Sequence, residues 1–125
     1  MAVRRFMTEA ALDLSALAKA SGMTPKSLSD ALVAGVPFAA TRARIEKGFG
    51  YRYPIWSNAQ DLDDRRLCME RFQFDPVCEG VRFLRKIAPR IGADFSGCFT
   101  KAQMERVCFH RAAATPATLK AGVAK

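Results

Sequence analysis

The stretch from Leu14 to Gly35 constrains the fold of this chain more than any other part of its sequence. Apolar residues recur there at i, i+3 and i+4 in two short segments, which is the spacing that lines one face of an α-helix. Between the two segments, Gly22 supplies the left-handed conformation that ends a helix without steric clash. Thr24 is expected to cap the second helix, with Pro25 in its first turn. The stretch therefore predicts two helices joined by a tight turn, the second running from about Pro25 to Ala34.

Small, glycine and apolar residues have a particular spacing in this stretch, as Ala18, Gly22, Met23, Leu28 and Ala31. This spacing resembles the helix-turn-helix of the phage repressor and Cro family. Ser21 departs from the family, which usually has an apolar residue at that position. The resemblance implies an N-terminal DNA-binding domain of four to five helices over residues 1–58, with the second helix of the pair in the major groove of duplex DNA.

Polar side chains on the second helix form a candidate edge for reading DNA. Lys26 is expected to contact a phosphate or a guanine, and Asp30 to accept from a cytosine amino group. A solvated face, with Lys26 and Asp30 paired at i, i+4, is the alternative. The helix expected over 38–49 would present basic residues to phosphates, or simply to solvent. The candidate DNA-binding residues are Thr24, Lys26, Ser27, Ser29, Asp30, Arg42, Arg44 and Lys47.

The segments that flank these helices carry further expectations. Residues 1–7 are expected to be a frayed basic start, or an arm whose Arg4 and Arg5 contact DNA. Along 38–49, the inward stripe is expected to be Phe38, Thr41, Ile45 and Phe49. The aromatic stretch 48–56 resembles the end of many repressor-like domains, where a short closing helix carries a tryptophan. Packing by Trp56 is expected, and stacking of Tyr51, Tyr53 or Trp56 on unpaired bases is the alternative.

The remainder of the chain predicts a helical C-terminal region over 59–111 and a flexible tail over 112–125. One helix is expected to end at Phe72, with acidic residues near its start, and another to open at Asp75-Pro76. A third is expected from Lys101 to about Arg111, capped by Thr100. The string formed by Phe95-Ser96-Gly97 and Thr100-Lys101-Ala102-Gln103 weakly resembles the SAP-type fold, which implies a second DNA contact. The alternative is that this C-terminal region forms a dimer contact or completes the core.

Charge and residue usage narrow the class of function. The net charge of +8 favours an anionic partner. Cys68, Cys78, Cys98 and Cys108 match no zinc spacing and are expected to be buried free thiols, with a zinc site including His110 or a redox switch as alternatives. Neither a phosphate loop nor a nucleophile motif is visible, so we expect no enzyme and no cofactor. Without a signal peptide or a membrane-length apolar run, the protein is expected to be cytoplasmic.

These observations predict an all-α protein that regulates transcription, as a repressor that binds double-stranded DNA as a homodimer. A small protein-binding adaptor or inhibitor, possibly phage-derived, is the main alternative, in which the helix pair is only a scaffold for a protein partner. A single-strand or RNA binder that uses Tyr51 and Tyr53 is a third hypothesis.

Overall fold

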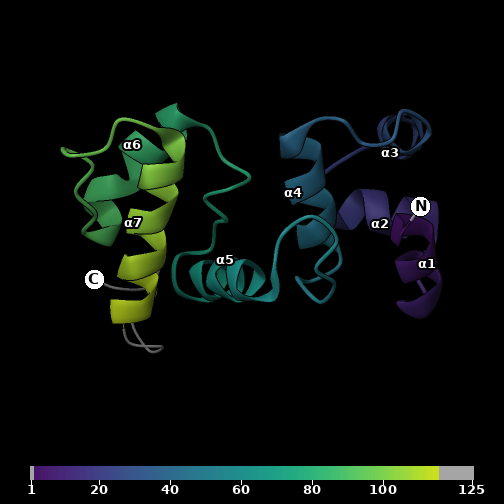
Figure 1. The fold of residues 1–125 in the computed structure, drawn as a ribbon, viewed down its shortest axis with the longest axis horizontal. Helices are drawn as coiled ribbons and strands as arrows, with labels where there is room; N and C mark the ends of the chain where they lie inside the picture. The colour runs from purple at the N-terminus through teal and green to yellow at the C-terminus, as the bar shows by residue number, and fades with distance from the viewer. Residues whose placement is uncertain (1, 116–125) are drawn as a thin grey trace. The chain divides into compact units, whose positions relative to one another are not determined.

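The computed structural model of the chain describes residues 2–115, and the regular secondary structure of these residues is all α-helix, without a strand (Figure 1). The prediction of an all-α fold is therefore confirmed. Among the described residues, no helix combines the length and the apolar character needed to cross a bilayer. The helices are α1 (Ala2–Glu9), α2 (Leu14–Ala20), α3 (Pro25–Val33), α4 (Ala39–Gly48), α5 (Ala59–Phe72), α6 (Val81–Ile91) and α7 (Lys101–Ala114).

The chain divides into two compact units, Met1–Leu62 and Asp63–Lys125, and the division falls inside α5. The predicted boundary at residue 58 coincides with the start of α5, where the Asn58 side chain accepts the Asp61 N–H at 2.8 Å. Each unit has its own buried apolar core, with no residue in common.

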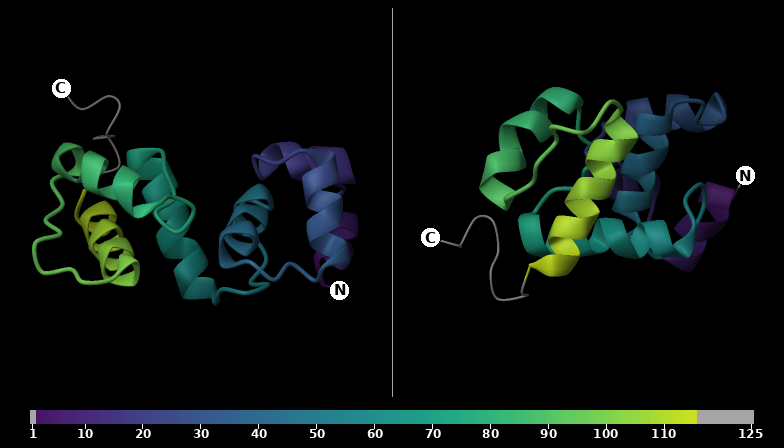
Figure 2. Two further views of the ribbon diagram at one scale, coloured as in Figure 1. Left: turned by 90° about the horizontal axis from the view of Figure 1, so that it is seen from above. Right: turned by 60° about the vertical axis from the view of Figure 1, so that its left-hand side comes forward.

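In the first unit, α2 packs against both α3 and α4, which are coloured in the purple-to-blue range in Figures 1 and 2. The predicted helix pair is present, and α3 ends one residue before the expected Ala34. Gly22 adopts a left-handed φ of 72°, as the turn requires. Thr24 caps α3, because its hydroxyl oxygen accepts the Ser27 N–H at 3.0 Å. The core of this unit is formed by Val3, Leu17, Ala18, Leu28, Leu32, Val36, Ile45 and Phe49.

The N-terminal residues differ from the expectation of a frayed start. They form α1, and Val3 is fully buried in the core of the first unit. The ring of Phe6 stacks on that of Tyr53, with centroids 4.3 Å apart and planes at 12°. Val3, Phe6 and Met7 follow the i, i+3, i+4 spacing, so the sequence contains a helical stripe where a frayed start is expected.

The closing helix expected around Trp56 is also absent. Residues 51–57 form turns and bends, beginning at Tyr51, whose φ is 62°. Trp56 is half-buried and packs against the core of the first unit, as expected. The segment is held by side-chain hydrogen bonds, described below, rather than by a helical backbone.

In the second unit, one core joins the C-terminal part of α5 to α6, α7 and the link between them. The expected helix start at Asp75-Pro76 is wrong. The Asp75 carboxylate is fully buried and accepts the Val77 N–H at 2.9 Å, which shapes a local turn. Consequently α6 begins only at Val81, after Gly80. The core residues are Cys68, Phe72, Phe74, Leu84, Ala88, Ile91, Phe95, Met104, Cys108 and Ala112.

The last helix, α7, begins where the sequence predicts but continues past the expected end. The Thr100 hydroxyl oxygen accepts the Gln103 N–H at 3.2 Å, and the Gln103 side chain accepts the Thr100 N–H at 2.9 Å. This reciprocal capping satisfies two backbone donors at the start of the helix. Residues 112–114, which were expected to belong to a flexible tail, form the last part of α7. The rest of that expected tail, from residue 116, lies outside the described residues.

Candidate nucleic-acid interface

The candidate reading edge lies on the side of α3 opposite to its buried residues. Leu28 and Leu32 face the core, while the start of the helix exposes polar side chains to solvent. The Thr24 hydroxyl is used locally, since besides capping the helix it donates to Ser27 Oγ at 2.9 Å. Of the candidates on this helix, Thr24, Lys26, Ser27 and Asp30 are exposed and Ser29 is half-buried.

Lys26 and Asp30 form the i, i+4 pair that the sequence suggested. The Lys26 Nζ lies 3.0 Å from Asp30 Oδ2, with side chains that are 86% and 67% exposed. Exposed pairs of this kind contribute little to stability, because water solvates both charges nearly as well. Either group is therefore available for a DNA contact at small cost to the fold.

The three candidate cations on α4 are not equivalent. Arg42 is half-buried, and its Nε donates to the Val36 carbonyl at 2.8 Å, which ties α4 to the loop after α3. Its guanidinium also lies 5.7 Å from the centre of the Trp56 ring. Arg44 is exposed and Lys47 half-buried, and neither has a hydrogen-bond or ion-pair partner within residues 2–115. Among the candidate cations on α4, Arg44 and Lys47 are thus the two whose side-chain charge forms no hydrogen bond or ion pair with the described part of the protein.

Glu46 organises this region and was missed by the sequence reading. Its side chain is buried, and it accepts the Trp56 N–H at 2.9 Å, the Ser57 N–H at 2.8 Å and the Ser57 hydroxyl at 2.9 Å. These bonds fasten residues 51–57 to α4. A glutamate between Ile45 and Lys47 looks like an ordinary solvated side chain, since its donors lie ten residues further on.

The aromatic residues proposed for base stacking are largely engaged within the protein. Tyr51 is buried. Tyr53 stacks on Phe6 and makes an edge contact with Phe49, at a centroid distance of 5.4 Å. The aromatic faces that a single-stranded nucleic acid would require are therefore mostly covered.

An apolar hollow of about 370 Å³ lies between α3 and the start of α4. Phe38 lines it and is 71% exposed, so its expected place in the inward stripe is wrong. The reason is that Phe38 precedes the first residue of α4 and does not follow the helical period. Val33, at the end of α3, is 83% exposed. This part of the first unit therefore presents both apolar and polar side chains.

The cysteines are free thiols, and they all lie in the second unit. Cys68 and Cys108 are buried, whereas Cys78 and Cys98 are half-buried, so the expectation of burial holds fully for two. Burial raises the pKa of Cys68 well above its usual value and that of Cys108 to about 11. Within residues 2–115, no three His, Cys, Asp or Glu side chains converge as a metal site would require. His110 is exposed on α7.

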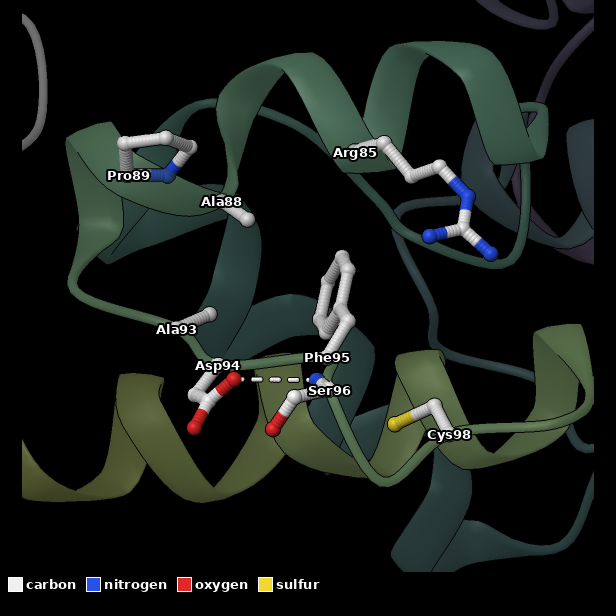
Figure 3. Close-up of a pocket in the computed structure, with 8 residues that line it drawn as sticks. All are labelled: Arg85, Ala88, Pro89, Ala93, Asp94, Phe95, Ser96 and Cys98. Carbon is white, nitrogen blue, oxygen red and sulfur yellow. Dashed lines mark hydrogen bonds between the residues drawn. The ribbon is translucent and has the colours of Figure 1, made fainter.

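A second hollow, of about 430 Å³, lies between α6 and the link to α7 (Figure 3). Asp94 is on its floor, and its carboxylate accepts the Ser96 N–H at 2.9 Å. This bond, together with the Ser96 hydroxyl, lowers the pKa of Asp94. The carboxylate therefore shapes the link. Arg85 lines the hollow from α6, and its guanidinium lies apart from Asp94 (Figure 3).

Comparisons of the chain with models of protein families, with curated proteins and with solved structures find no match. The geometry that bears on function is then the arrangement of α2, α3 and α4. It brings an exposed polar edge, a pair of unpartnered cations and an apolar hollow together in one unit.

Proposed function

We propose that this protein is a DNA-binding transcriptional regulator, a repressor that reads duplex DNA with α3 as a homodimer. The observation that carries the proposal is the exposure of the polar start of α3, while α2 covers the opposite side of the helix. A helix held in this way can place its first turns against base edges in a major groove.

The roles of individual residues follow from their surroundings. Lys26 and Asp30 would contact base edges, and their ion pair with each other would break when these contacts form. Ser27 and Ser29 would contribute hydroxyl donors, and Thr24 would mainly hold the start of the helix. Arg44 and Lys47 would bind phosphates, and Arg42 would orient the loop before α4 while its terminal N–H groups face a phosphate. A homodimer would place two copies of α3 about one turn of DNA apart.

The first test is selection of a random duplex library on the purified protein, repeated over a salt series. An enriched palindrome is the expected result, and the spacing of its halves would report the distance between the two α3 helices. Enrichment without two-fold symmetry would contradict the homodimer. Salt-sensitive binding without enrichment would contradict sequence reading, since phosphate contacts alone carry no sequence information.

Lys26→Ala tests the reading edge directly. We expect it to weaken binding to the enriched duplex by about 1 kcal/mol or more, roughly fivefold, because a base contact is lost. Lys19→Ala is the matched control, since it removes an exposed lysine from α2 in the same unit. Anisotropy titrations with labelled duplex measure both variants. Equal affinity and equal sequence preference for the two variants would show that α3 is not the reading helix.

A protein-binding adaptor is the second candidate function, and the apolar hollow beside Phe38 favours it. Large exposed apolar residues next to a hollow are common where proteins bind one another. The discriminating result is duplex binding at low salt. If none is detected, DNA recognition is rejected, and Phe38→Ser should then abolish capture of a protein partner.

A further inference from the structure

The exposed side of α6 carries a row of cations with no acidic residue among them. Arg82, Arg85, Lys86 and Arg90 are exposed, and the helix from Val81 to Ile91 contains neither aspartate nor glutamate. This row belongs to the second unit, away in sequence from the candidate reading edge on α3.

These four cations differ from every other arginine and lysine of the second unit that the structure describes. Arg65, Arg66 and Lys101 pair with acidic side chains at 2.7–2.9 Å. Arg71 and Arg111 donate to the carbonyl groups of Ala112 and Ile91. Arg106 also has a partner. Within residues 63–115, the cations with no hydrogen-bond or ion-pair partner are thus all on α6.

The row has a regular spacing along the helix. Arg82, Lys86 and Arg90 follow one another at i+4, so they are separated by about 6 Å along one side of the helix and span about 12 Å. One strand of duplex DNA advances about 3.4 Å per phosphate along its axis. A row of this length therefore spans about three to four such steps, which join four to five successive phosphates.

The opposite side of α6 decides between the possible anionic partners. Leu84, Ala88 and Ile91 are buried in the core of the second unit, and Phe83 makes an edge contact with the ring of Phe74, centroids 5.4 Å apart. An amphipathic helix that lies in a membrane surface must bury its apolar side in the lipid. Leu84, Ala88 and Ile91 are thus already covered by protein, whereas Val81 and Phe83 are 37% and 38% exposed. Because most of the apolar side is covered, charge is the main property that α6 can offer a partner.

We propose that α6 is a second DNA-contacting surface, on which Arg82, Lys86 and Arg90 bind phosphates of one duplex strand and Arg85 supplements them. The contact is independent of base sequence, since it uses only point charges and guanidinium groups against a phosphate backbone. It involves the same polymer as the proposed function of α3, but it does not require α3 to read bases.

The test compares two double variants that each remove two positive charges from the second unit. Arg82→Gln with Lys86→Gln removes half of the α6 cations, whereas Arg66→Gln with Arg106→Gln removes two cations that have partners. The full-length protein is titrated into a labelled duplex of arbitrary sequence over a salt series. The slope of log K against log salt is about 0.9 per phosphate contacted. We expect the slope to decrease in magnitude by about 1.8 in the α6 variant and to change little in the other.

Two further measurements complete the test. The charge-preserving exchange Arg82→Lys with Lys86→Arg should keep the wild-type slope, which excludes disruption of the helix as the cause. Equal slopes for the two glutamine double variants would overturn the proposal, as would absence of duplex binding at low salt. Binding to phosphatidylserine vesicles without duplex binding would also overturn it, in favour of a lipid surface. If the Arg82→Gln, Lys86→Gln variant enriches the same duplex sequence as the wild type but has a reduced salt slope, the phosphate contact of α6 is supported independently of base reading by α3.

Discussion

Arg65 and Asp75 form an ion pair that is almost completely removed from water. The Arg65 Nε lies 2.8 Å from Asp75 Oδ2, with side chains that are 1% and 0% exposed. Asp75 also accepts the Val77 N–H, so its carboxylate connects α5 to the turn before α6. A buried charge that loses its partner is strongly destabilising, because the remaining ion has neither water nor a counter-charge.

Arg65→Gln should therefore lower the free energy of unfolding by about 3–5 kcal/mol. Arg66→Gln is the adjacent control, since its pair with Asp63 is exposed and should contribute about 0–1 kcal/mol. Urea unfolding followed by far-UV circular dichroism measures both. If the two variants lower the free energy of unfolding by similar amounts, the buried pair contributes no more to stability than the exposed one.

The interior positions of α5 were not predictable from apolar periodicity. In the sequence, Leu62, Arg65, Leu67, Met69 and Phe72 give only a poor helical stripe. The buried positions are Leu62, Arg65, Cys68 and Phe72. Arg65 fits the helical period only if an arginine is accepted inside the core. Its neutralising partner is ten residues further along the chain, and nothing local in the sequence identifies it.

At the scale of the elements, the contact between α2 and α4 depends on small residues. A Cβ on Gly48 would collide with the Ser21 hydroxyl and lie 3.2 Å from the Ser21 backbone nitrogen and from Leu17 Cδ1. The Ser21 hydroxyl is buried, and within the described residues it has no hydrogen-bond partner. Ser21 was recognised in the sequence as a departure from the repressor family. The structure shows that its small size fits beside Gly48.

Gly48→Ala should destabilise the first unit by about 1–3 kcal/mol through overpacking, even though alanine favours helices. Gly97→Ala is the control, since a Cβ there meets nothing within 4 Å. Ser21→Ala removes the closest obstacle and an unsatisfied buried hydroxyl, so it should be neutral or stabilising and should partly rescue Gly48→Ala. Thermal unfolding of the single and double variants measures the coupling. Additive effects would show that Ser21 and Gly48 do not share this contact.

The sequence predicted elements best where caps and glycines mark their ends. Thr24, Gly22 and Thr100 located the ends of α2, α3 and α7 because their local geometry depends on near neighbours. The start of α6 was misplaced because Asp75-Pro76 is a good helix opening by local rules. Its carboxylate is instead used by Arg65 from another helix, which is a tertiary interaction. The same reason explains why the role of Glu46 was missed.

At the scale of the whole molecule, each unit has its own spectroscopic or chemical probe. The single tryptophan, Trp56, lies in the first unit, and the cysteines lie in the second. Burial raises the pKa of Cys108 to about 11, so at pH 8 its thiol is both protonated and inaccessible in the folded protein. Thiol labelling and tryptophan emission therefore report on different cores.

Because the two cores share no residue, we expect their unfolding to be separable. Gly48→Ala should lower the urea midpoint of Trp56 emission and leave the labelling of Cys68 and Cys108 unchanged. Arg65→Gln should have the opposite pattern. Pulsed labelling at pH 8 with mass spectrometry, read beside emission on the same samples, makes the comparison. If either variant moves both midpoints equally, the chain unfolds as one cooperative body.

The buried carboxylate of Glu46 sets a limit on how short a fragment of the first unit can be made. The last helix that belongs wholly to that unit, α4, ends at Gly48, which would suggest a short recombinant fragment for NMR or crystallisation. Glu46, however, takes hydrogen bonds from Trp56 and Ser57. A fragment cut before Ser57 would keep a charged group in its interior without these donors. The practical C-terminal limit of a fragment of the first unit is therefore Ser57 or later.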